Sequence, residues 1–270
     1  MLRIIGVENQ IKSTSIIGVI TMLAEERFDR ILALLDQKRA ATVPEMCAVT
    51  GASEATIRRD LGILDRQGRL SKVHGGAVAV ATEFESRERD VLTKEQLYVQ
   101  EKERIARYAA RQIQDEDVVF IDAGTTTLRM VDHLGGCRAL FVTTGIECAR
   151  RLVQKGLRVY VVGGQLKPGT EAIVGAAALD TIRRYNFTKA FLGVNGVTVR
   201  QGCTTPDAEE AAVKTAAIQQ AYLSYVLADS SKFGKVAAVT ICALDKACIL
   251  TDHVPDDQYR QNGIIKEVEE

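Results

Sequence analysis

The chain contains no tryptophan, only three histidines and six scattered cysteines in its 270 residues. No two cysteines have CxxC spacing, and the sequence has no HExxH motif and no cluster of cysteine with histidine. Structural metal sites need several such ligands at short, regular spacing, so the sequence predicts no metal centre. The neighbours of the cysteines are apolar or small, and we expect most of them to be buried like small hydrophobic side chains.

An excess of charge is also absent, because 35 lysines and arginines balance 35 aspartates and glutamates. A strongly basic chain would point to nucleic acid directly, so any DNA-binding surface here has to be a local patch. Long hydrophobic runs are missing too, and the apolar run at 16–20 is too short to span a bilayer. We therefore expect a cytoplasmic protein with no membrane partner. Residues 1–22 are predicted to be a poorly ordered leader, with Met22 as an alternative start.

Residues 23–80 contain the pattern of three short helices. The first is predicted by apolar residues at i, i+3, i+4 and i+7, which are Phe28, Ile31, Leu32 and Leu35. A second helix is expected over 43–49, with Pro44 in its first turn. A tight turn at 50–52 follows, and Ser53 is a suitable N-cap for the third helix. A helix followed by two more that share a short glycine-containing turn is the plan of a helix-turn-helix.

The third predicted helix carries the side chains that we expect to read DNA. Ile57, Leu61 and Leu64 form its buried face, so its hydroxyl and guanidinium groups face outward in the half that enters a major groove. Residues 69–76 then alternate in polarity and turn at glycines, which predicts a two-stranded wing. The expected groove contacts are Thr56, Arg58 and Arg59, and the expected phosphate contacts are Ser53, Lys72 and His74. These charges alone would fit a solvated surface, but the order of helix, turn, capped helix and basic wing favours DNA binding.

Residues 81–101 are rich in charge of both signs, which is typical of a linker or an exposed helix. From 102 to 270 the chain alternates helix and strand patterns. Continuous apolar runs predict strands buried on both faces at 118–121, 140–142, 159–162, 190–194, 225–228 and 249–250. Repeated strand–helix units predict an α/β domain with a mainly parallel sheet, in which ligands bind beyond the carboxyl ends of the strands.

A glycine and three threonines follow the first of these strands, at 124–127. Glycine lets a ligand approach the backbone, the hydroxyls can donate, and the start of the next helix attracts an anion. No Walker lysine follows and no GxGxxG motif occurs, so a nucleotide is weakly supported. A threonine-rich helix cap is the alternative explanation.

A second polar cluster occupies 202–214, where Pro206 is expected in the first turn of a helix. Its polar side chains are Thr204, Thr205, Asp207, Glu210 and Lys214. The last three are spaced to share one helix face, where carboxylates can accept from hydroxyls and a lysine can pair with phosphate. An ordinary surface ion pair between Glu210 and Lys214 is the alternative.

The stretches SEATIRRDL and VHGGA resemble the DNA-binding module of the DeoR family of bacterial regulators. IDAGTTT, VTTG, VVGGQLK, FLGVNGV, GCTTPDAEEAAVK and LADSSKFG occur in the order found in the sensor domains of that family. Those domains are similar to sugar-phosphate isomerases of the ribose-5-phosphate isomerase type, so the resemblance implies a Rossmann-like α/β sensor of a phosphorylated sugar at 102–270. The effector-binding residues expected are Asp122, Gly124, Thr125, Thr126, Thr127, Thr144, Gly145, Asn195, Thr204, Thr205, Asp207, Glu210, Lys214 and Lys232. Thr144 departs from the family, which usually has asparagine there.

The longer match around LKPGTEAIVGAAAL looks most like the fructose-operon repressors of the family, which implies fructose-1-phosphate as effector. Tagatose-6-phosphate and other ketose or hexose phosphates stay open. We expect a repressor that binds double-stranded operator DNA as a homo-oligomer, a dimer or tetramer, with no cofactor besides its effector and no catalytic residues. An activator of the same architecture is one alternative. A sugar-phosphate isomerase or kinase with an accessory DNA-binding domain is another, with Glu210 or Asp122 as base and Lys214 stabilising an enediolate.

Overall fold

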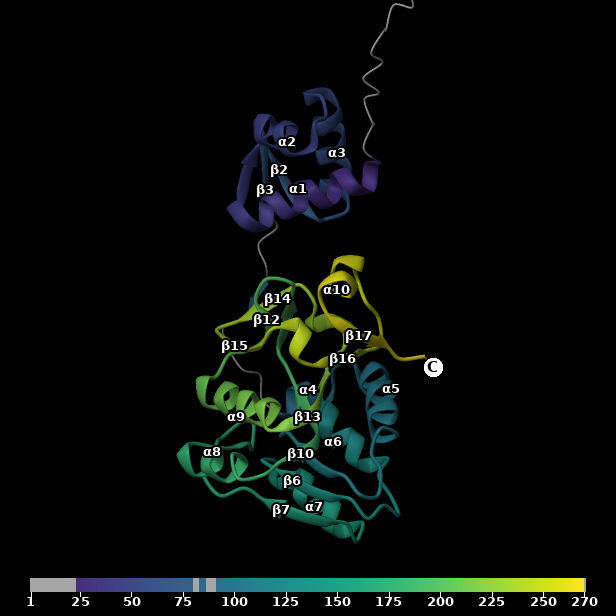
Figure 1. Cartoon of the computed structure of the whole chain (residues 1–270), viewed down its shortest axis with the longest axis vertical. Coiled ribbons are helices and arrows are strands. Elements are labelled where there is room, and N and C mark those ends of the chain that lie inside the picture. Colours follow the sequence, from purple (N-terminus) through teal and green to yellow (C-terminus); the bar gives the residue numbers. More distant parts are fainter. Residues whose placement is uncertain (1–22, 80–82, 86–90, 270) are drawn as a thin grey trace, which may run out of the picture. The chain divides into compact units, whose positions relative to one another are not determined.

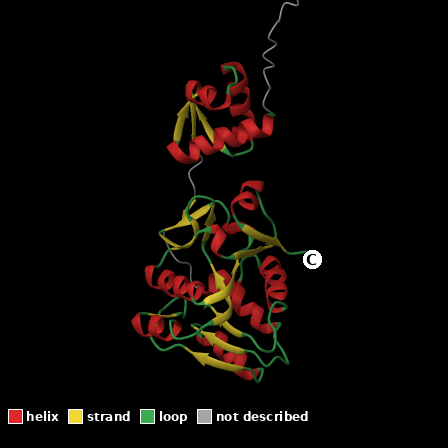
Figure 2. Cartoon of the chain, in the orientation of Figure 1, coloured by secondary structure: helices red, strands yellow, loops and turns green. Residues whose placement is uncertain are grey.

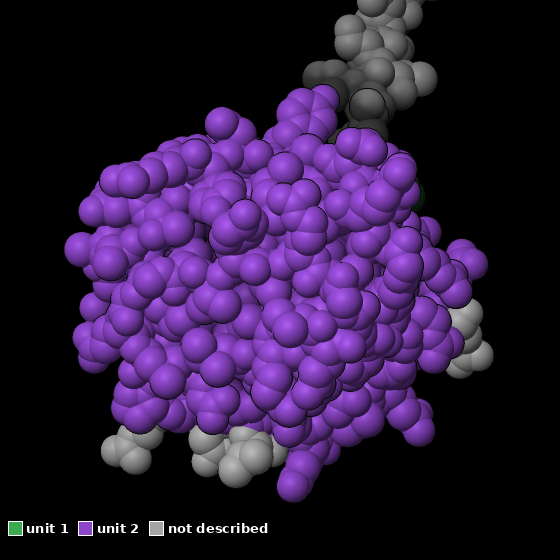
Figure 3. Space-filling model, turned by 90° about the horizontal axis from the view of Figure 1, so that it is seen from below, with its two compact units in different colours: residues 1–80 green, residues 81–270 purple. Residues whose placement is uncertain are grey.

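The computed structural model describes residues 23–79, 83–85 and 91–269. The chain divides into two compact units, Met1–Val80 and Ala81–Glu270 (Figure 1). Figure 3 shows a space-filling view of the second unit. The predicted leader, residues 1–22, lies outside the described residues. Within the described ranges, no helix has the length and apolar character needed to cross a membrane.

The N-terminal unit is a winged helix-turn-helix, as predicted. Its elements are α1 (Ala24–Lys38), β1 (Ala40–Thr42), α2 (Val43–Thr50), α3 (Glu54–Arg66), β2 (Leu70–Val73) and β3 (Gly76–Ala79). The strands form an antiparallel sheet in the order β1-β3-β2, so the wing is the predicted hairpin β2–β3. Strand β1 has no counterpart in the sequence prediction, because three residues are too few to show an alternating pattern. A Cβ at Gly76 would lie 2.2 Å from the carbonyl oxygen of Ala41, so only glycine lets β3 approach β1 this closely.

The helix ends in this unit follow local signals of the sequence. Thr42 and Glu45 form a capping box at the start of α2. Gly51 ends α2 in the left-handed region at φ 70°. Ser53 then begins α3, and its Oγ accepts a hydrogen bond from the main-chain N of Thr56 at 3.3 Å. A side-chain N-cap of this kind contributes about 1 kcal/mol to helix stability.

The apolar faces of α1, α2 and α3 meet in one small core. Its fully buried side chains include Ile31, Leu35, Met46, Ile57, Leu61, Leu64 and Leu70. Beside this core, Arg27 of α1 forms a bidentate ion pair with Asp60 of α3, with Nε–Oδ2 at 2.7 Å and Nη2–Oδ1 at 3.1 Å. The hydrogen bond with Asp60 raises the pKa of the Arg27 guanidinium, and the pair fixes α1 against the predicted recognition helix.

A seven-stranded, entirely parallel sheet forms the centre of the second unit, in the order β17-β16-β13-β10-β5-β6-β7 (Figure 2). The strands are β5 (Val118–Ile121), β6 (Leu140–Thr143), β7 (Arg158–Val161), β10 (Phe187–Gly193), β13 (Ala221–Leu227), β16 (Cys248–Thr251) and β17 (Ile264–Glu267). The six apolar runs of the sequence fall on the first six of these. Strand β17 lies at the sheet edge, and its short mixed sequence gives no continuous apolar run.

Helices cover both faces of this sheet, so the arrangement is the predicted Rossmann-like α/β one and is doubly wound. They are α5 (Val99–Ala110), α6 (Thr125–Asp132), α7 (Ile146–Gln154), α8 (Ala176–Ile182) and α9 (Ala208–Gln219). Val119 and Ile121 of β5 pack in the cluster with α5, α6 and α7, whereas Phe120 between them packs with α8 and α9. Both sides of the strand are therefore buried, which explains its uninterrupted apolar run.

The remaining elements of the second unit are short. They are α4 (Val91–Glu95), the antiparallel set β11 (Gly196–Thr198), β12 (Gly202–Thr205) and β15 (Val239–Cys242), the pair β4 (Glu83–Glu85) and β14 (Lys235–Ala237), the pair β8 (Gln165–Leu166) and β9 (Ile173–Val174), the turns η1 (Ser230–Lys232) and η2 (Leu244–Lys246), and α10 (Asp257–Asn262). The prediction for Pro206 was wrong: it precedes Asp207, the N-cap of α9, and so lies outside the first turn. Strand β4, helix α4 and the start of α5 lie in the interval 81–101, for which we predicted a linker or an exposed helix.

Candidate functional site

The surface of α3 presents the predicted groove contacts. Ser53, Arg58 and Arg59 are exposed and Thr56 is half-buried. The hydroxyls of Ser53 and Thr56 lie 3.0 Å apart, and Arg58 pairs with Glu54 at 3.1 Å across one helical turn. Both partners of that ion pair are well exposed, so it holds Arg58 only weakly and leaves it able to turn to a phosphate or a guanine edge.

The wing carries the other two predicted contacts. Lys72 lies on β2 and His74 in the turn between β2 and β3, and both side chains are exposed. The main-chain N of Lys72 donates to Oδ1 of Asp65 in α3 at 2.8 Å, which fastens the wing to the recognition helix. The positions of all six residues remain compatible with DNA contact, and that role stays a prediction.

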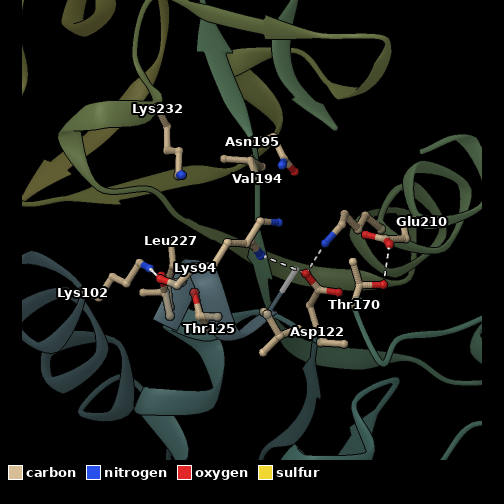
Figure 4. Close-up of a pocket in the computed structure, with 16 residues that line it drawn as sticks. Lys94, Lys102, Asp122, Thr125, Thr170, Val194, Asn195, Glu210, Leu227 and Lys232 are labelled. Atoms are coloured by element: carbon tan, nitrogen blue, oxygen red, sulfur yellow. Dashed lines mark hydrogen bonds and ion pairs between the residues drawn. The ribbon is translucent and has the colours of Figure 1, made fainter. Parts of the chain in front are cut away.

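A polar cavity of about 600 Å³, open solvent at its mouth included, lies at the carboxyl ends of β5, β10 and β13 (Figure 4). Eight of the predicted effector residues line it: Asp122, Gly124, Thr125, Thr126, Asn195, Glu210, Lys214 and Lys232. Among its other lining residues are Val91, Lys94, Lys102, Thr170, Gly193 and Leu227. The location matches the rule that parallel sheets bind ligands beyond their carboxyl edge.

On one side of this cavity, each charged side chain is paired with a side chain of opposite charge. The Lys214 ammonium contacts Oδ2 of Asp122, which also accepts from the main-chain N of Gly193 at 3.0 Å. Glu210 pairs with Lys167 at 3.0 Å and accepts from the Thr170 hydroxyl at 2.8 Å. The alternative of a surface ion pair between Glu210 and Lys214 is therefore wrong, because both side chains are buried and each has another partner.

Lys167 connects this side of the cavity to the start of α9, because its ammonium also lies 2.7 Å from Oδ2 of Asp207. Burial works to raise the pKa of Asp207, but hydrogen bonds from Lys167 and from the main chain of Glu210 outweigh it and lower the pKa. Asp207 does not line the cavity. It caps α9 and, through Lys167, positions Glu210, which does line the cavity.

The opposite side of the cavity is cationic. Lys102 of α5 is only 3 % exposed, and its ammonium donates to the main-chain carbonyl of Lys94 in α4. Burial lowers the pKa of Lys102 to about 8, nearby Asp229 opposes this, and Lys232 lowers it further. Helix α6 begins at Thr125 on the same cavity wall, and the N-terminus of a helix attracts anions.

The remaining predicted effector residues lie outside the cavity lining and support its loops. Thr127 is fully buried and donates to the Asp122 carbonyl at 2.8 Å, so it shapes the loop that holds Gly124. Thr204 accepts from the main-chain N of Ala237 at 2.9 Å. Thr205 donates to Oδ1 of Asn195 at 3.2 Å. Gly145 lines a smaller hollow of about 320 Å³ beside the cavity. Thr144 is buried, and its hydroxyl has no hydrogen-bond partner among the described residues.

Sequence reasoning missed Lys102, Lys94, Lys167 and Thr170 as site residues. Lys102 stands in register with Ile105 and Ala109, so it occupies the buried face of α5. A lysine on an apolar helix face is a recognisable signal of a buried functional cation. Lys94 lies in the charged interval that resembled a linker, and Lys167 and Thr170 come from the loop after β8, where no local pattern points to the cavity.

A winged helix-turn-helix joined to an α/β unit with a polar, cation-rich cavity defines a DNA-binding regulator with a ligand sensor. Two family models match the chain: the DeoR C terminal sensor domain at residues 98–253 and the DeoR-like helix-turn-helix domain at residues 27–83. The protein therefore belongs to the DeoR family of transcriptional regulators, as its motifs indicated.

Proteins similar to this chain include two regulators and one solved structure. The chain is 38 % identical over 251 residues to the uncharacterized HTH-type transcriptional regulator FruR of Bacillus subtilis, which covers 92 % of this chain and 99 % of that protein. It is 31 % identical over 233 residues to the lactose phosphotransferase system repressor of Staphylococcus epidermidis, covering 84 % and 92 %. Among solved structures, ribose 5-phosphate isomerase A from Methanocaldococcus jannaschii matches with a TM-score of 0.37 at 18 % identity, over 49 % of this chain and 53 % of that one.

Proposed function

We propose that the protein is a cytoplasmic repressor of a sugar-utilisation operon, and that a phosphorylated sugar releases it from operator DNA. The proposal of a phosphorylated sugar as effector rests on one observation, which is that the two sides of the cavity differ in chemistry. Lys102, Lys232 and the start of α6 offer positive charge to a phosphate. Across from them, Asp122, Asn195 and Glu210 offer oxygens to sugar hydroxyls.

Fructose-1-phosphate is the effector that we favour. The stretch LKPGTEAIVGAAAL resembles fructose-operon repressors, and the match to the Bacillus subtilis regulator FruR extends over nearly the whole of both chains. The effector is testable by isothermal titration of the pure protein with fructose-1-phosphate, tagatose-6-phosphate, fructose-6-phosphate and unphosphorylated fructose. We expect binding only of phosphorylated sugars, with fructose-1-phosphate bound most tightly. Equally tight binding of unphosphorylated fructose would contradict the proposal that the cavity recognises a phosphate.

We infer that α4 carries the signal out of the cavity. Val91 and Lys94 of this helix line the cavity, and the carbonyl of Lys94 accepts from Lys102. The carbonyl of Glu95 accepts from Nη2 of Arg129 at 3.1 Å. A phosphate that attracts the Lys102 ammonium competes with the Lys94 carbonyl, so effector binding changes how α4 is held. Because β4 and α4 follow the DNA-binding unit in sequence, the change reaches the chain that leads to it.

A catalytic role fits the cavity less well. Asp122 and Glu210, the two carboxylates proposed as bases in the enzyme alternative, are each engaged by a lysine. Oδ2 of Asp122 already accepts from Lys214 and from the main-chain N of Gly193, and Oε1 of Glu210 from Lys167 and Thr170, so neither oxygen is free to take a proton from a substrate. We propose that the protein binds its sugar phosphate without turnover, which an assay for aldose–ketose interconversion of ribose-5-phosphate and fructose-6-phosphate tests directly.

We further propose that the repressor acts as a homo-oligomer on double-stranded DNA. Helix-turn-helix repressors commonly read two half-sites one or more helical turns apart, which requires two reading units. Sedimentation equilibrium of the free protein, and footprinting on operator DNA selected from a random pool, test the oligomeric state and the repeated half-sites. A monomer that protects a single half-site would contradict the proposal.

A further inference from the structure

Two cysteines face each other in the small sheet beside the cavity. Cys203 of β12 and Cys242 of β15 are register partners in an antiparallel pair, whose register shifts between Cys203 and Thr204. Residues so placed have Cα atoms about 4.5–5.5 Å apart and side chains on one face of the sheet. A disulfide spans Cα separations of about 4.4–6.8 Å, so the pair needs no large backbone movement to close. The two thiols lie close enough for each to shift the pKa of the other.

The backbone around this pair is held in close contact. A Cβ at Gly202 would lie 2.1 Å from the main-chain oxygen of Cys242 and 2.9 Å from Cα of Ala243. Gly202 also has φ 70°, where other residues are strained. Glycine at this position therefore permits an approach that brings the next residue, Cys203, directly against β15.

The two thiols differ in access and in acidity. Cys203 is 1 % exposed, whereas Cys242 is half-buried. The neighbouring Cys203 thiol lowers the pKa of Cys242, whereas the neighbouring Cys242 thiol and burial raise the pKa of Cys203. A more accessible thiol that ionises more readily, with a second thiol at the paired position behind it, is the usual arrangement of an attacking and a resolving cysteine.

We propose that Cys203 and Cys242 are a reversible redox pair, which a peroxide oxidises to a disulfide and a dithiol reduces. The Cys242 thiolate attacks the peroxide, so that an S–O bond forms, the O–O bond breaks and hydroxide leaves and is protonated. Cys203 loses its proton and attacks the Cys242 sulfur, so that an S–S bond forms and the S–O bond breaks, and the departing hydroxide takes up the proton and leaves as water. The two sulfurs together lose two electrons, which the peroxide receives. A dithiol reverses the step by exchange and becomes a disulfide itself.

The pair lies between two supports of the polar side of the cavity. On β12, Thr205 donates to Oδ1 of Asn195 at 3.2 Å. On β15, the carbonyl of Ile241 accepts from the Thr215 hydroxyl at 2.8 Å, one residue beyond Lys214 in α9. A bond between β12 and β15 ties these supports together, so oxidation of the pair alters how the polar side of the cavity holds the effector.

Peptide mapping of the full-length protein tests the pair itself. The reduced protein is treated with hydrogen peroxide, free thiols are alkylated, and cross-linked peptides are identified by mass spectrometry. We expect one cross-link, between Cys203 and Cys242, that disappears on treatment with dithiothreitol. Cys242→Ser should not form it, and Cys248→Ser, which removes another half-buried cysteine, should still do so. Wild-type protein that keeps Cys203 as a thiol while Cys242 proceeds to sulfinic acid would overturn the proposal, whatever the variants do.

Titration with inorganic phosphate and with fructose-1-phosphate tests the consequence. We expect Kd to differ at least threefold between the reduced and the oxidised protein, and the difference to vanish in Cys242→Ser. A disulfide that forms without any change in Kd would overturn the link to the cavity. The mapping experiment needs no ligand, so it separates a failure of the redox pair from a failure of the proposed effector.

Discussion

The ammonium of Lys214 lies against Oδ2 of Asp122, and the two side chains are only 6 % and 4 % exposed. This ion pair joins α9 to the end of β5 across the floor of the cavity. A buried pair of this kind adds little net stability, but each partner depends on the other because an isolated buried charge is costly.

Removal of one partner should therefore damage the protein more than removal of both. Lys214→Ala is expected to lower the free energy of unfolding of the sensor unit by about 3–5 kcal/mol, because Asp122 keeps an uncompensated charge. The double variant Asp122→Asn/Lys214→Met should recover most of that loss in chemical denaturation yet bind no phosphorylated sugar. A full effector response in Lys214→Ala would contradict the placement of the effector.

Lys102 should matter for binding and not for folding. Lys102→Met removes a buried ammonium whose pKa is already lowered by burial, so thermal stability should be unchanged or higher. Loss of a charged hydrogen bond to phosphate should weaken effector binding about 10- to 100-fold. Lys246→Met, at an exposed lysine in η2, serves as the control and should leave Kd unchanged. Unaltered binding in Lys102→Met would place the phosphate elsewhere.

The lowered pKa of Lys102 also predicts two dependences on pH. Affinity for the phosphorylated sugar should fall as pH rises through about 8, because only the protonated ammonium attracts the phosphate. Between about pH 8 and the ordinary lysine value of 10.5, the unfolded chain holds a proton that the folded protein has released. The Lys102 contribution to stability therefore rises with pH across that window. Denaturation of wild type against Lys102→Met at several pH values checks the sign, and a contribution that falls over this window would refute it.

Loss of a predicted groove contact and loss of a predicted phosphate contact should weaken DNA binding in different ways. Arg58→Ala is expected to weaken operator binding by about 1–3 kcal/mol and to relax base preference at one position, because the side chain reads a base edge. Lys72→Ala should weaken binding to all sequences alike and reduce the salt dependence by about one counterion. Fluorescence anisotropy at several salt concentrations measures both. Wild-type binding by Arg58→Ala would show that α3 does not read DNA through this side chain.

Helices and strands of this fold could be predicted from the sequence where their burial produces a regular pattern of apolar residues. Strand β5, which is covered on both faces, has a continuous apolar run, and the N-cap of α3 was visible in Ser53. Strands such as β12 were missed, because they contain buried polar residues. The hydroxyls of Thr204 and Thr205 are hydrogen-bonded inside the fold, so the strand has no continuous apolar run. The partners in the cavity could not be deduced either. Lys214 lies four residues from Glu210 but pairs with Asp122, 92 residues away, since tertiary packing decides which buried charges meet.

The most direct test of a sugar-phosphate-responsive repressor is operator release. Labelled operator DNA, selected by the protein from a random pool, is bound at low salt and titrated with fructose-1-phosphate while anisotropy is followed. A saturable fall that fructose does not produce, and that is lost in Lys102→Met, is the predicted result. DNA that stays fully bound at saturating fructose-1-phosphate, and with every other ketose or hexose phosphate tried, would contradict the proposed regulation.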